Sequence, residues 1–220
     1  MPEENDMNKL VFVLLGKTGS GKSTILNMIR EVRGKEIEKL PSYTTRPMRS
    51  NEKNSDEYFF ITDDQFELMI EHDLLMEHRK YTQAQGGVWK CGTGFPESNY
   101  SITTMTPDVI PTCMSVPGIT VYPIYISIDS NLRYKRLEMR EMHLDNPNFE
   151  EFKRRFQSDE ERYTQKVLYD AGIRPENTFS NDGYAFNTTR NIILYIDDII
   201  NNDRKERYTQ KVLYDAGIRP

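Results

Sequence analysis

The sequence predicts an α/β domain, and two stretches of the chain carry this prediction. In the first, the apolar run 10–15 leads into a glycine-rich loop at 16–23, and residues 23–30 continue as the start of a helix. In the second, 119–128 has the composition of another buried strand, and a helix follows it with Asp129 or Ser130 as its N-cap. The length of 220 residues suits one such domain better than two.

The loop at 16–23 reads Gly-Lys-Thr-Gly-Ser-Gly-Lys-Ser, which is the phosphate-binding pattern G-x-x-x-x-G-K-[ST]. Its glycines let successive N–H groups turn toward one anion, and the helix N-terminus adds its positive dipole end. We expect Lys22 to reach the β- and γ-phosphates of a nucleoside triphosphate and the Ser23 hydroxyl to bind Mg²⁺. A glycine-rich turn without a ligand is the alternative. The candidate triphosphate-binding residues are Gly16, Thr18, Gly19, Ser20, Gly21, Lys22, Ser23 and Thr24.

Composition restricts the classes of function. The net charge is -5, with 29 Lys and Arg against 34 Asp and Glu, so general nucleic-acid binding is not expected. No stretch approaches the ~18 consecutive apolar residues that span a bilayer, and residues 1–6 are unlike a secretory signal. Two cysteines make no disulfide framework. We therefore expect a cytoplasmic protein that binds small anionic substrates through local arginines, without a membrane or nucleic-acid partner; a protein partner stays unknown.

Two arginines in the segment after the first helix are candidates for such anion binding. Arg46 and Arg49 stand three residues apart in an extended stretch, with Pro47 between them. A proline in this position does not suit a helix, whereas two guanidinium groups at this spacing can hold one phosphate from two sides. A pair of exposed charges is the alternative.

The pattern S-x-T-T-R-x-x-R-x-x-E at 42–52, followed by Tyr58, a helix and an L-L-M-E strand, resembles the nucleotide-monophosphate lobe of guanylate kinases. With the loop at 16–23, the resemblance covers about residues 9–203. It implies a P-loop NTPase three-layer fold, with a parallel β-sheet core at about 9–41, 99–135 and 160–203, a small NMP-binding lobe at about 42–98 and a helical lid at about 136–159. The implied activity is ATP-dependent phosphorylation of GMP or dGMP to GDP by in-line transfer with Mg²⁺.

The resemblance also implies roles for residues of the acceptor lobe. Ser42 and Glu77 match the family's readers of the guanine edge, and this agrees with the chemistry of the base. One carboxylate can accept both N1–H and N2–H₂ of guanine, while adenine would leave a buried carboxylate unpaired. Glu77 taken alone is as easily a solvated charge at a strand end. The full set implied to bind GMP is Ser42, Arg46, Arg49, Tyr58, Glu77 and Thr93.

The lid is implied to carry arginines that close on the ATP phosphates. Arg136 and Arg140 stand four residues apart in the helix predicted over 132–140, so they share one face. A second helix, predicted over 148–172, carries Arg155. Phosphoryl transfer needs positioning and cationic stabilisation more than covalent chemistry. An amphipathic hairpin with a charged outer face is the alternative. The implied catalytic residues are Lys22, Arg46, Arg136, Arg140 and Arg155.

Two departures from the family pattern concern the acceptor site. Thr104 or Thr106 stands where the family usually has an aspartate, and Cys91 replaces a phosphate-contacting tyrosine. Losses of this kind cost ~1–3 kcal/mol per missing charged hydrogen bond, which is enough to slow a GMP kinase or to shift its acceptor. Two alternatives therefore stay open. One is a guanylate-kinase-like binding module with weakened catalysis, and the other is a P-loop kinase for another phosphorylated acceptor.

The C-terminal part contributes one weak binding candidate, a packing element and a repeat. Asn181 matches the family's adenine-side turn, although an Asn-Asp-Gly turn is common without a ligand. The isoleucines of 192–200 form a helical stripe that predicts core packing. Residues 206–220 repeat 161–175 letter for letter, after the domain is already complete. We expect this duplicated tail to be disordered, poorly ordered or loosely helical.

Overall fold

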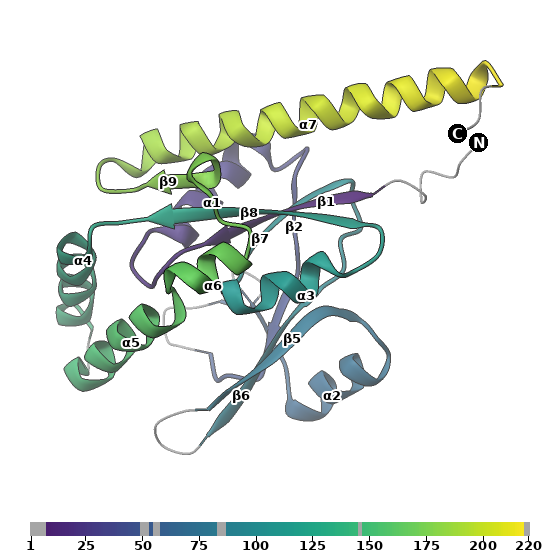
Figure 1. Ribbon diagram of the computed structural model, residues 1–220. Helices are drawn as coiled ribbons and strands as arrows, with labels where there is room; N and C mark the ends of the chain where they lie inside the picture. Colours follow the sequence, from purple (N-terminus) through teal and green to yellow (C-terminus); the bar gives the residue numbers. More distant parts are fainter. Residues whose placement is uncertain (1–7, 49–52, 55–57, 83–86, 145–146, 218–220) are drawn as a thin grey trace.

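The computed structural model describes residues 8–48, 53–54, 58–82, 87–144 and 147–217 (Figure 1). Its larger sheet comprises β1 (Lys9–Leu15), β2 (Glu38–Lys39), β7 (Tyr100–Thr104), β8 (Ile119–Ser127) and β9 (Thr178–Ser180). Its smaller sheet comprises β3 (Ser42–Thr44), β4 (Phe59–Phe60), β5 (Leu75–Thr82) and β6 (Val88–Gly94). The α-helices are α1 (Lys22–Arg33), α2 (Asp63–Glu71), α3 (Ile110–Met114), α4 (Ser130–Met142), α5 (Phe149–Arg162), α6 (Gln165–Asp170) and α7 (Ala185–Asp215). Short 3₁₀ turns are η2 (Pro107–Val109) and η3 (Pro175–Asn177).

The larger sheet is parallel throughout, in the order β2-β7-β1-β8-β9. β1 lies at its centre, as the apolar run 10–15 predicts, because a strand with neighbours on both sides and helices on both faces is buried all round. Pro123 occurs within β8 but precedes the part of that strand, Tyr125–Ser127, that pairs with β9. A proline is tolerated there because it lies opposite β1 on only one side.

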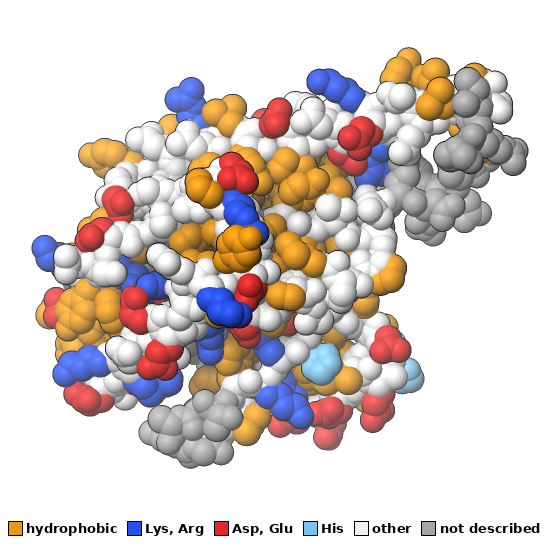
Figure 2. Space-filling view, in the orientation of Figure 1, with side chains coloured by type: hydrophobic (Ala, Val, Ile, Leu, Met, Phe, Trp, Pro, Cys, Tyr) orange, Lys and Arg blue, Asp and Glu red, His pale blue; other side chains and the backbone are white. Residues whose placement is uncertain are grey.

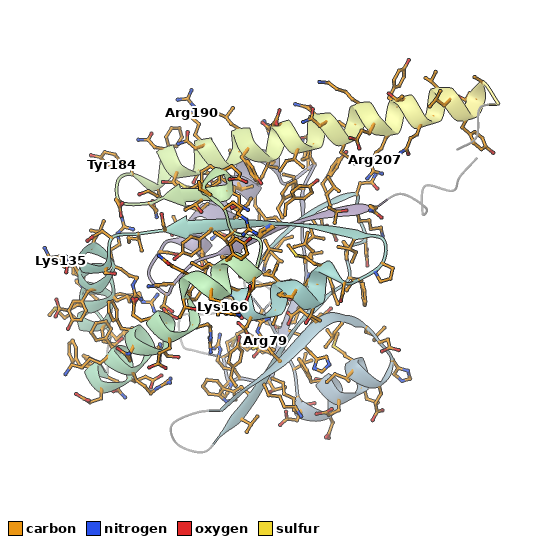
Figure 3. All side chains as sticks on the ribbon, viewed as in Figure 1. Arg79, Lys135, Lys166, Tyr184, Arg190 and Arg207 are labelled. Atoms are coloured by element: carbon orange, nitrogen blue, oxygen red, sulfur yellow. The ribbon has the colours of Figure 1, made fainter. Side chains whose placement is uncertain are left out.

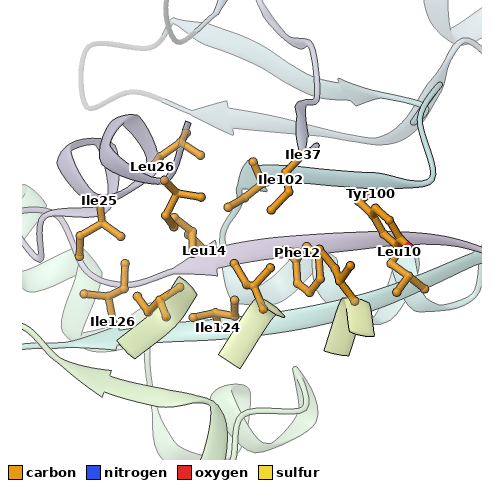
Figure 4. Close-up of a cluster of buried hydrophobic side chains, with 14 residues drawn as sticks. Leu10, Phe12, Leu14, Ile25, Leu26, Ile37, Tyr100, Ile102, Ile124 and Ile126 are labelled. Carbon is orange, nitrogen blue, oxygen red and sulfur yellow. The ribbon is translucent and has the colours of Figure 1, made fainter. Parts of the chain in front are cut away.

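Alternate residues of β1 face two separate cores. Leu10, Phe12 and Leu14 pack with α1 and α7, as Figure 4 shows for the first core. Val11, Val13 and Leu15 pack on the other face with Ile110 of α3 and Ala171. The period of two along a strand produces this division. The result is a helix–sheet–helix sandwich, the three-layer arrangement that the resemblance implies (Figure 1).

The smaller sheet forms a separate lobe below the core, with α2 beside it (Figure 1). Its order is β4-β3-β6-β5; β6 is antiparallel to β3 and β5, and β4 is parallel to β3. Thr62 begins α2 with a capping box, in which Thr62 and Gln65 bond each other's backbone N–H. This lobe covers most of the predicted NMP-binding region.

The predicted single helix over 148–172 is wrong, because the structure divides it into α5 and α6. Asn148, at the start of the predicted range, caps α5 by accepting a hydrogen bond from Glu151 N–H. The helix then ends at Tyr163, whose ring is buried and stacks on Tyr125 with the centroids 6.2 Å apart. Thr164 caps α6 through its hydroxyl. The burial of one tyrosine and a new cap thus interrupt a helix that local propensity would continue.

The predicted isoleucine stripe is confirmed in α7, where Ile192, Ile196 and Ile200 are buried in the first core. The same helix runs on through Asp215, so residues 206–215 are helical rather than disordered. Arg207 bonds Asp203 at 2.5 Å and the Asn8 carbonyl at 2.6 Å. Beyond it the helix projects away from the body of the protein (Figure 1), and Tyr208 is 70% exposed. None of the helices in the described ranges has the length and apolar character that a bilayer span requires.

Truncation before Tyr208 should change the free energy of unfolding by less than about 1 kcal/mol, because the side chains that follow are mostly exposed. Truncation before Ile200 should cost at least about 3 kcal/mol, since it removes a buried isoleucine and the Asp203 partner of Tyr100. Urea denaturation of both truncated chains measures the difference. A large loss of unfolding free energy in the chain truncated before Tyr208 would contradict the view that the core ends near Arg207.

Candidate active site

The glycine-rich loop joins the end of β1 to the start of α1, as its sequence predicts. Gly19 and Gly21 have φ angles of 85° and 94°, in the left-handed region that favours glycine. At Gly21 a Cβ atom would lie 2.5 Å from the Asn181 amide nitrogen, so a side chain there would clash as well as strain the backbone. These glycines are therefore required by the loop's curvature and by what packs against it.

Lys22 lies at the first residue of α1, and its ammonium group turns back over the loop. It donates to the carbonyl oxygen of Gly16 and, at 3.1 Å, to that of Lys17. Ser23 and Thr24 follow in the first helical turn and are exposed. An ammonium group and a helix N-terminus thus meet at one loop, which is the arrangement that binds phosphates.

Helices α4 and α5 hold the outer side of this loop. Asp159 of α5 accepts a hydrogen bond from Thr18 N–H at 2.6 Å, and Glu160 pairs with Lys17 at 2.5 Å. Both carboxylates also bind Arg133 of α4, at 3.4 Å and 2.5 Å. Arg133 is fully buried, and its guanidinium lies 3.6 Å from the centre of the Phe156 ring. The loop is therefore tied to α4 and α5, the two helices that carry the predicted lid, by a buried cation and two acids.

The three candidate lid arginines lie on these helices in different surroundings. Arg155 donates to Glu151 at 2.8 Å, whereas Arg136 and Arg140 form no ion pair with another described residue. Hydrogen bonds from Ser180 and from the Asp129 N–H hold the pKa of Asp182 below its usual range, and the charge of Arg136 adds to this effect. Arg136 therefore lies near the turn after β9. The role of Arg136, Arg140 and Arg155 in binding ATP stays a prediction.

Asn181 differs from its predicted role as a contact to adenine. Its side chain is buried, and its amide donates to the Ser20 carbonyl at 2.7 Å. Its carbonyl oxygen accepts from Thr188 at 3.3 Å. Both ends of the amide are thus engaged inside the protein, and Asn181 supports the loop from behind instead of facing a base.

Asn181→Ala should lower the free energy of unfolding by about 1–3 kcal/mol, because it leaves the buried Ser20 carbonyl without its donor. The loop pattern predicts ATP binding, so loss of the loop's support should also raise the KM for ATP more than that for the acceptor of the predicted reaction. Thermal unfolding and steady-state kinetics measure the two effects. Equal KM values for ATP in the variant and the wild type would contradict the support role.

Three of the residues implied to bind GMP, including both predicted base readers, meet in one row of the smaller sheet. Thr93 of β6 lies opposite Ser42 of β3 on one side and opposite Glu77 of β5 on the other. All three are buried, and the Thr93 hydroxyl donates to Glu77 at 2.7 Å. The sequence places these residues up to 51 positions apart, and antiparallel pairing brings them together.

Of the predicted phosphate-binding residues, Arg46 and Tyr58 lie together. The Arg46 guanidinium is 5.7 Å from the centre of the Tyr58 ring and 5.1 Å from that of Phe60. Arg49 lies outside the described residues. Cys91 is half-buried beside Thr44, with its sulfur 3.1 Å from the Thr44 hydroxyl. Burial raises the pKa of this thiol, so it is present as a neutral group.

The end of β7 and the turn after it carry threonines, Thr104 and Thr106, where the resemblance would place an aspartate. Thr104 ends the strand, and Thr106 begins the following 3₁₀ turn with a buried hydroxyl that has no hydrogen-bond partner among the described residues. Asp108 lies in that turn and is exposed. No carboxylate therefore replaces the expected aspartate at this strand end.

Sequence reasoning missed two arginines that the structure makes prominent. Arg133 stands four residues before the buried Leu137, so a cation in an apolar stripe is the signal that could have revealed it. Arg79 stands two residues after Glu77 on the same strand, and period-two alternation puts both side chains on one face. Figure 3 labels Arg79 on the side of the lobe that faces the core.

Known proteins resemble this chain in sequence at its N-terminal part and in fold throughout. The guanylate kinase family model matches residues 8–89. The guanylate kinase of Koribacter versatilis is 40% identical over 72 residues, which are 33% of this chain and 30% of that protein. The guanylate kinase of Legionella pneumophila (strain Lens) is 38% identical over 80 residues, or 36% of this chain and 37% of that protein. The aligned part thus spans about a third of these relatives.

The likeness in fold extends over nearly the whole chain. The crystal structure of guanylate kinase from Anaplasma phagocytophilum superposes with a TM-score of 0.59 at 17% sequence identity, over 97% of each chain. The similar sequence therefore includes the phosphate loop and most of the acceptor lobe, while the remainder shares the architecture. Residues 8–89 thus resemble guanylate kinases in sequence, and the chain shares the fold of a guanylate kinase.

Proposed function

We propose that the protein transfers the γ-phosphoryl group of ATP to GMP or dGMP, with Mg²⁺. The observation that carries this proposal is the buried row of Ser42, Thr93 and Glu77 in the same chain as the phosphate loop. A carboxylate beside two hydroxyls is complementary to the donor pair and the O6 acceptor of guanine. The family match over residues 8–89, which includes Ser42 and Glu77, supports the same acceptor.

The chain's own residues supply binding and charge. Lys22 and the loop amides would hold the terminal phosphates of ATP, and Arg46 with Tyr58 would hold the acceptor phosphate. Arg136, Arg140 and Arg155 would add positive charge from the lid and exclude water. In-line transfer needs little else from the protein, because the reaction is mainly one of positioning.

The residues fit a Mg²⁺ ion that arrives with ATP. No group of three or more His, Cys, Asp or Glu side chains within the described ranges could hold a metal. Mg²⁺ prefers substrate phosphates with few protein ligands, and the exposed Ser23 hydroxyl at the loop suits that role. When bound, the ion neutralises charge on the transferred phosphate.

A cytoplasmic location and small-molecule substrates are parts of the same proposal. Cys91 and Cys113 are both free thiols, which suits a reducing compartment such as the cytoplasm. On the face shown in Figure 2, basic and acidic side chains are interspersed, so this face carries no basic patch for nucleic acid. We propose small-molecule substrates only.

A coupled measurement of ADP release with ATP and Mg²⁺ tests this function against GMP, dGMP, AMP, CMP and UMP. Turnover with GMP or dGMP, but not with AMP or the pyrimidine nucleotides, is the expected result. Turnover that is slow at saturating GMP would reflect the absent aspartate at Thr104 and Thr106 and the thiol of Cys91. Binding of ATP without turnover of any acceptor would instead favour a binding module, and a preference for another acceptor would favour a different kinase.

A further inference from the structure

Glu77 forms a buried ion pair with Arg79 that its proposed role as a base reader does not require. The Glu77 Oε2 atom lies 2.7 Å from Arg79 Nη1, and the two side chains are 1% and 13% exposed. The other carboxylate oxygen, Oε1, accepts a hydrogen bond from the Thr93 hydroxyl at 2.7 Å. The Oε2 atom is itself buried and has no hydrogen-bond donor among the described residues, so its contact with Arg79 is an ion pair. A carboxylate oxygen can accept more than one hydrogen bond, so these contacts leave Glu77 acceptor capacity for a base.

Arg79 is itself held firmly in place. Its Nε donates to the Tyr81 hydroxyl at 2.5 Å, and Arg162 of α5 stacks over the same Tyr81 ring at 5.3 Å. Burial alone lowers the pKa of Arg79, but the charge of Glu77 and of nearby titratable groups outweighs it, so the pKa is above its usual value. Arg79 is therefore a permanent cation beside the carboxylate.

The other groups around Glu77 do not replace this cation. Cys91 on β6 and Cys113 on α3 are buried thiols with raised pKa values, that of Cys113 reaching about 12, so both are neutral. The acids of α2, Asp63 and Glu67, pair with Lys90. The charge of Arg46, from the β3 side, acts on the Cys91 thiol and lowers its pKa slightly against the effect of burial. Arg79 is a cation in direct contact with this carboxylate, at 2.7 Å.

The protonation state of Glu77 decides which base it fits. An ionised carboxylate accepts from N1–H and N2–H₂ of guanine. A protonated carboxyl group can donate to N1 of adenine and accept from its N6–H₂, because it then has one donor and one acceptor. A buried carboxyl group without a cation favours the protonated form. The same side chain would then read the wrong purine.

We propose that Arg79 sets the base specificity of the acceptor site by holding Glu77 in the charged form that pairs with guanine. This inference rests on the proposed function for its choice of ligand. Arg79 acts through Glu77 and is therefore a positioning residue. It excludes the neutral, adenine-compatible form of the site and keeps the carboxylate oriented between Thr93 and the base.

The test measures dissociation constants for GMP and AMP by calorimetry, for the wild-type chain and for Arg79→Met, at about pH 8 and about pH 6. GMP and AMP carry the same phosphate group, and its protonation affects the binding of both. The ratio of the two dissociation constants is therefore independent of phosphate titration. We expect Arg79→Met to lower the preference for GMP about 30-fold at the lower pH and less at the higher pH. The wild-type preference should change little between the two.

Three further variants separate this role from a structural one. Arg79→Lys should restore most of the preference, since it restores the charge. Lys90→Met removes a cation of equal exposure, 13%, from the same lobe but away from Glu77, and should leave the preference unchanged. Glu77→Gln offers one donor and one acceptor at any pH, so its preference should be low and independent of pH. Adding Arg79→Met to Glu77→Gln should then have no further effect on the ratio.

The outcomes distinguish this inference from the proposed function. If the wild type binds GMP in preference to AMP but transfers no phosphate, the function fails and the specificity role is still measured by binding. If Arg79→Met keeps the wild-type ratio at both pH values, or weakens GMP and AMP equally, the inference is wrong. A wild-type chain that binds neither nucleotide would also overturn it.

Discussion

Lys22→Ala should lower the turnover number for GMP phosphorylation by at least about a thousandfold, while the chain stays folded. The ammonium group lies at the start of α1 and turns over the loop, where it bonds the carbonyl groups of Gly16 and Lys17. In the proposed reaction it would exchange these partners for phosphate oxygens, whose negative charge grows during transfer. Alanine removes the charge and leaves the apolar core below the loop unchanged. The coupled assay measures turnover, and circular dichroism measures folding.

The neighbouring lysine provides a matched control for this variant. Lys17 belongs to the same loop, but its ammonium group pairs with Glu160 of α5. Lys17→Met should therefore lower turnover less than about tenfold, with the main effect on stability. If both variants lost activity equally, the specific role of Lys22 would be contradicted. Retention of most activity in Lys22→Ala would refute the phosphate-loop assignment.

Arg133→Leu should lower the free energy of unfolding by about 3 kcal/mol. The side chain is fully buried, and its guanidinium compensates Asp159 and Glu160 while packing on the ring of Phe156. Leucine fills part of the space, but within the described ranges it leaves the buried Asp159 carboxylate with the Thr18 N–H as its one remaining hydrogen-bond donor. An uncompensated charge at such a site costs more than the lost attraction alone. Urea denaturation measures the change.

A surface pair on α5 gives the comparison for this prediction. Arg154 makes two hydrogen bonds to Glu151, at 2.7 Å and 2.9 Å, but it is 46% exposed. Arg154→Leu should cost less than about 1 kcal/mol, because water screens and replaces such a pair. If Arg133→Leu and Arg154→Leu lost similar amounts of unfolding free energy, the expected effect of burial would be contradicted. Arg133→Leu should also raise the KM for ATP, since Asp159 then holds the loop less firmly.

The local features of the fold could be predicted from sequence because short-range chemistry decides them. The strand before the glycine-rich loop, the helix after it, and the caps at Thr62, Asp129 and Asn148 all follow from residues within a few positions of one another. The buried stripe of α7 is likewise visible as a helical period of isoleucines. Each of these signals is complete within one element.

The parts of the candidate site that sequence reasoning missed depend on contacts between elements. Arg133 becomes a support of the loop only when α4 and α5 enclose it. Asn181 looks like a ligand-facing turn residue, but its distant partner Ser20 determines where the amide points. Arg79 gains its importance from the pairing with Glu77 inside a closed lobe. Residue type and spacing along the chain do not encode such partners.

The duplicated segment shows within one molecule what the sequence determines and what tertiary contacts decide. Residues 161–175 and 206–220 have the same sequence, which settles their composition, their helical propensity and the threonine that can begin a helix. In the first copy Thr164 caps α6 and Tyr163 is buried. In the second, Thr209 bonds the Lys205 carbonyl within α7 and Tyr208 is exposed. The larger sheet offers Tyr163 a buried place beside Tyr125, whereas nothing in the described chain covers Tyr208, so the burial of one aromatic ring decides whether the helix breaks.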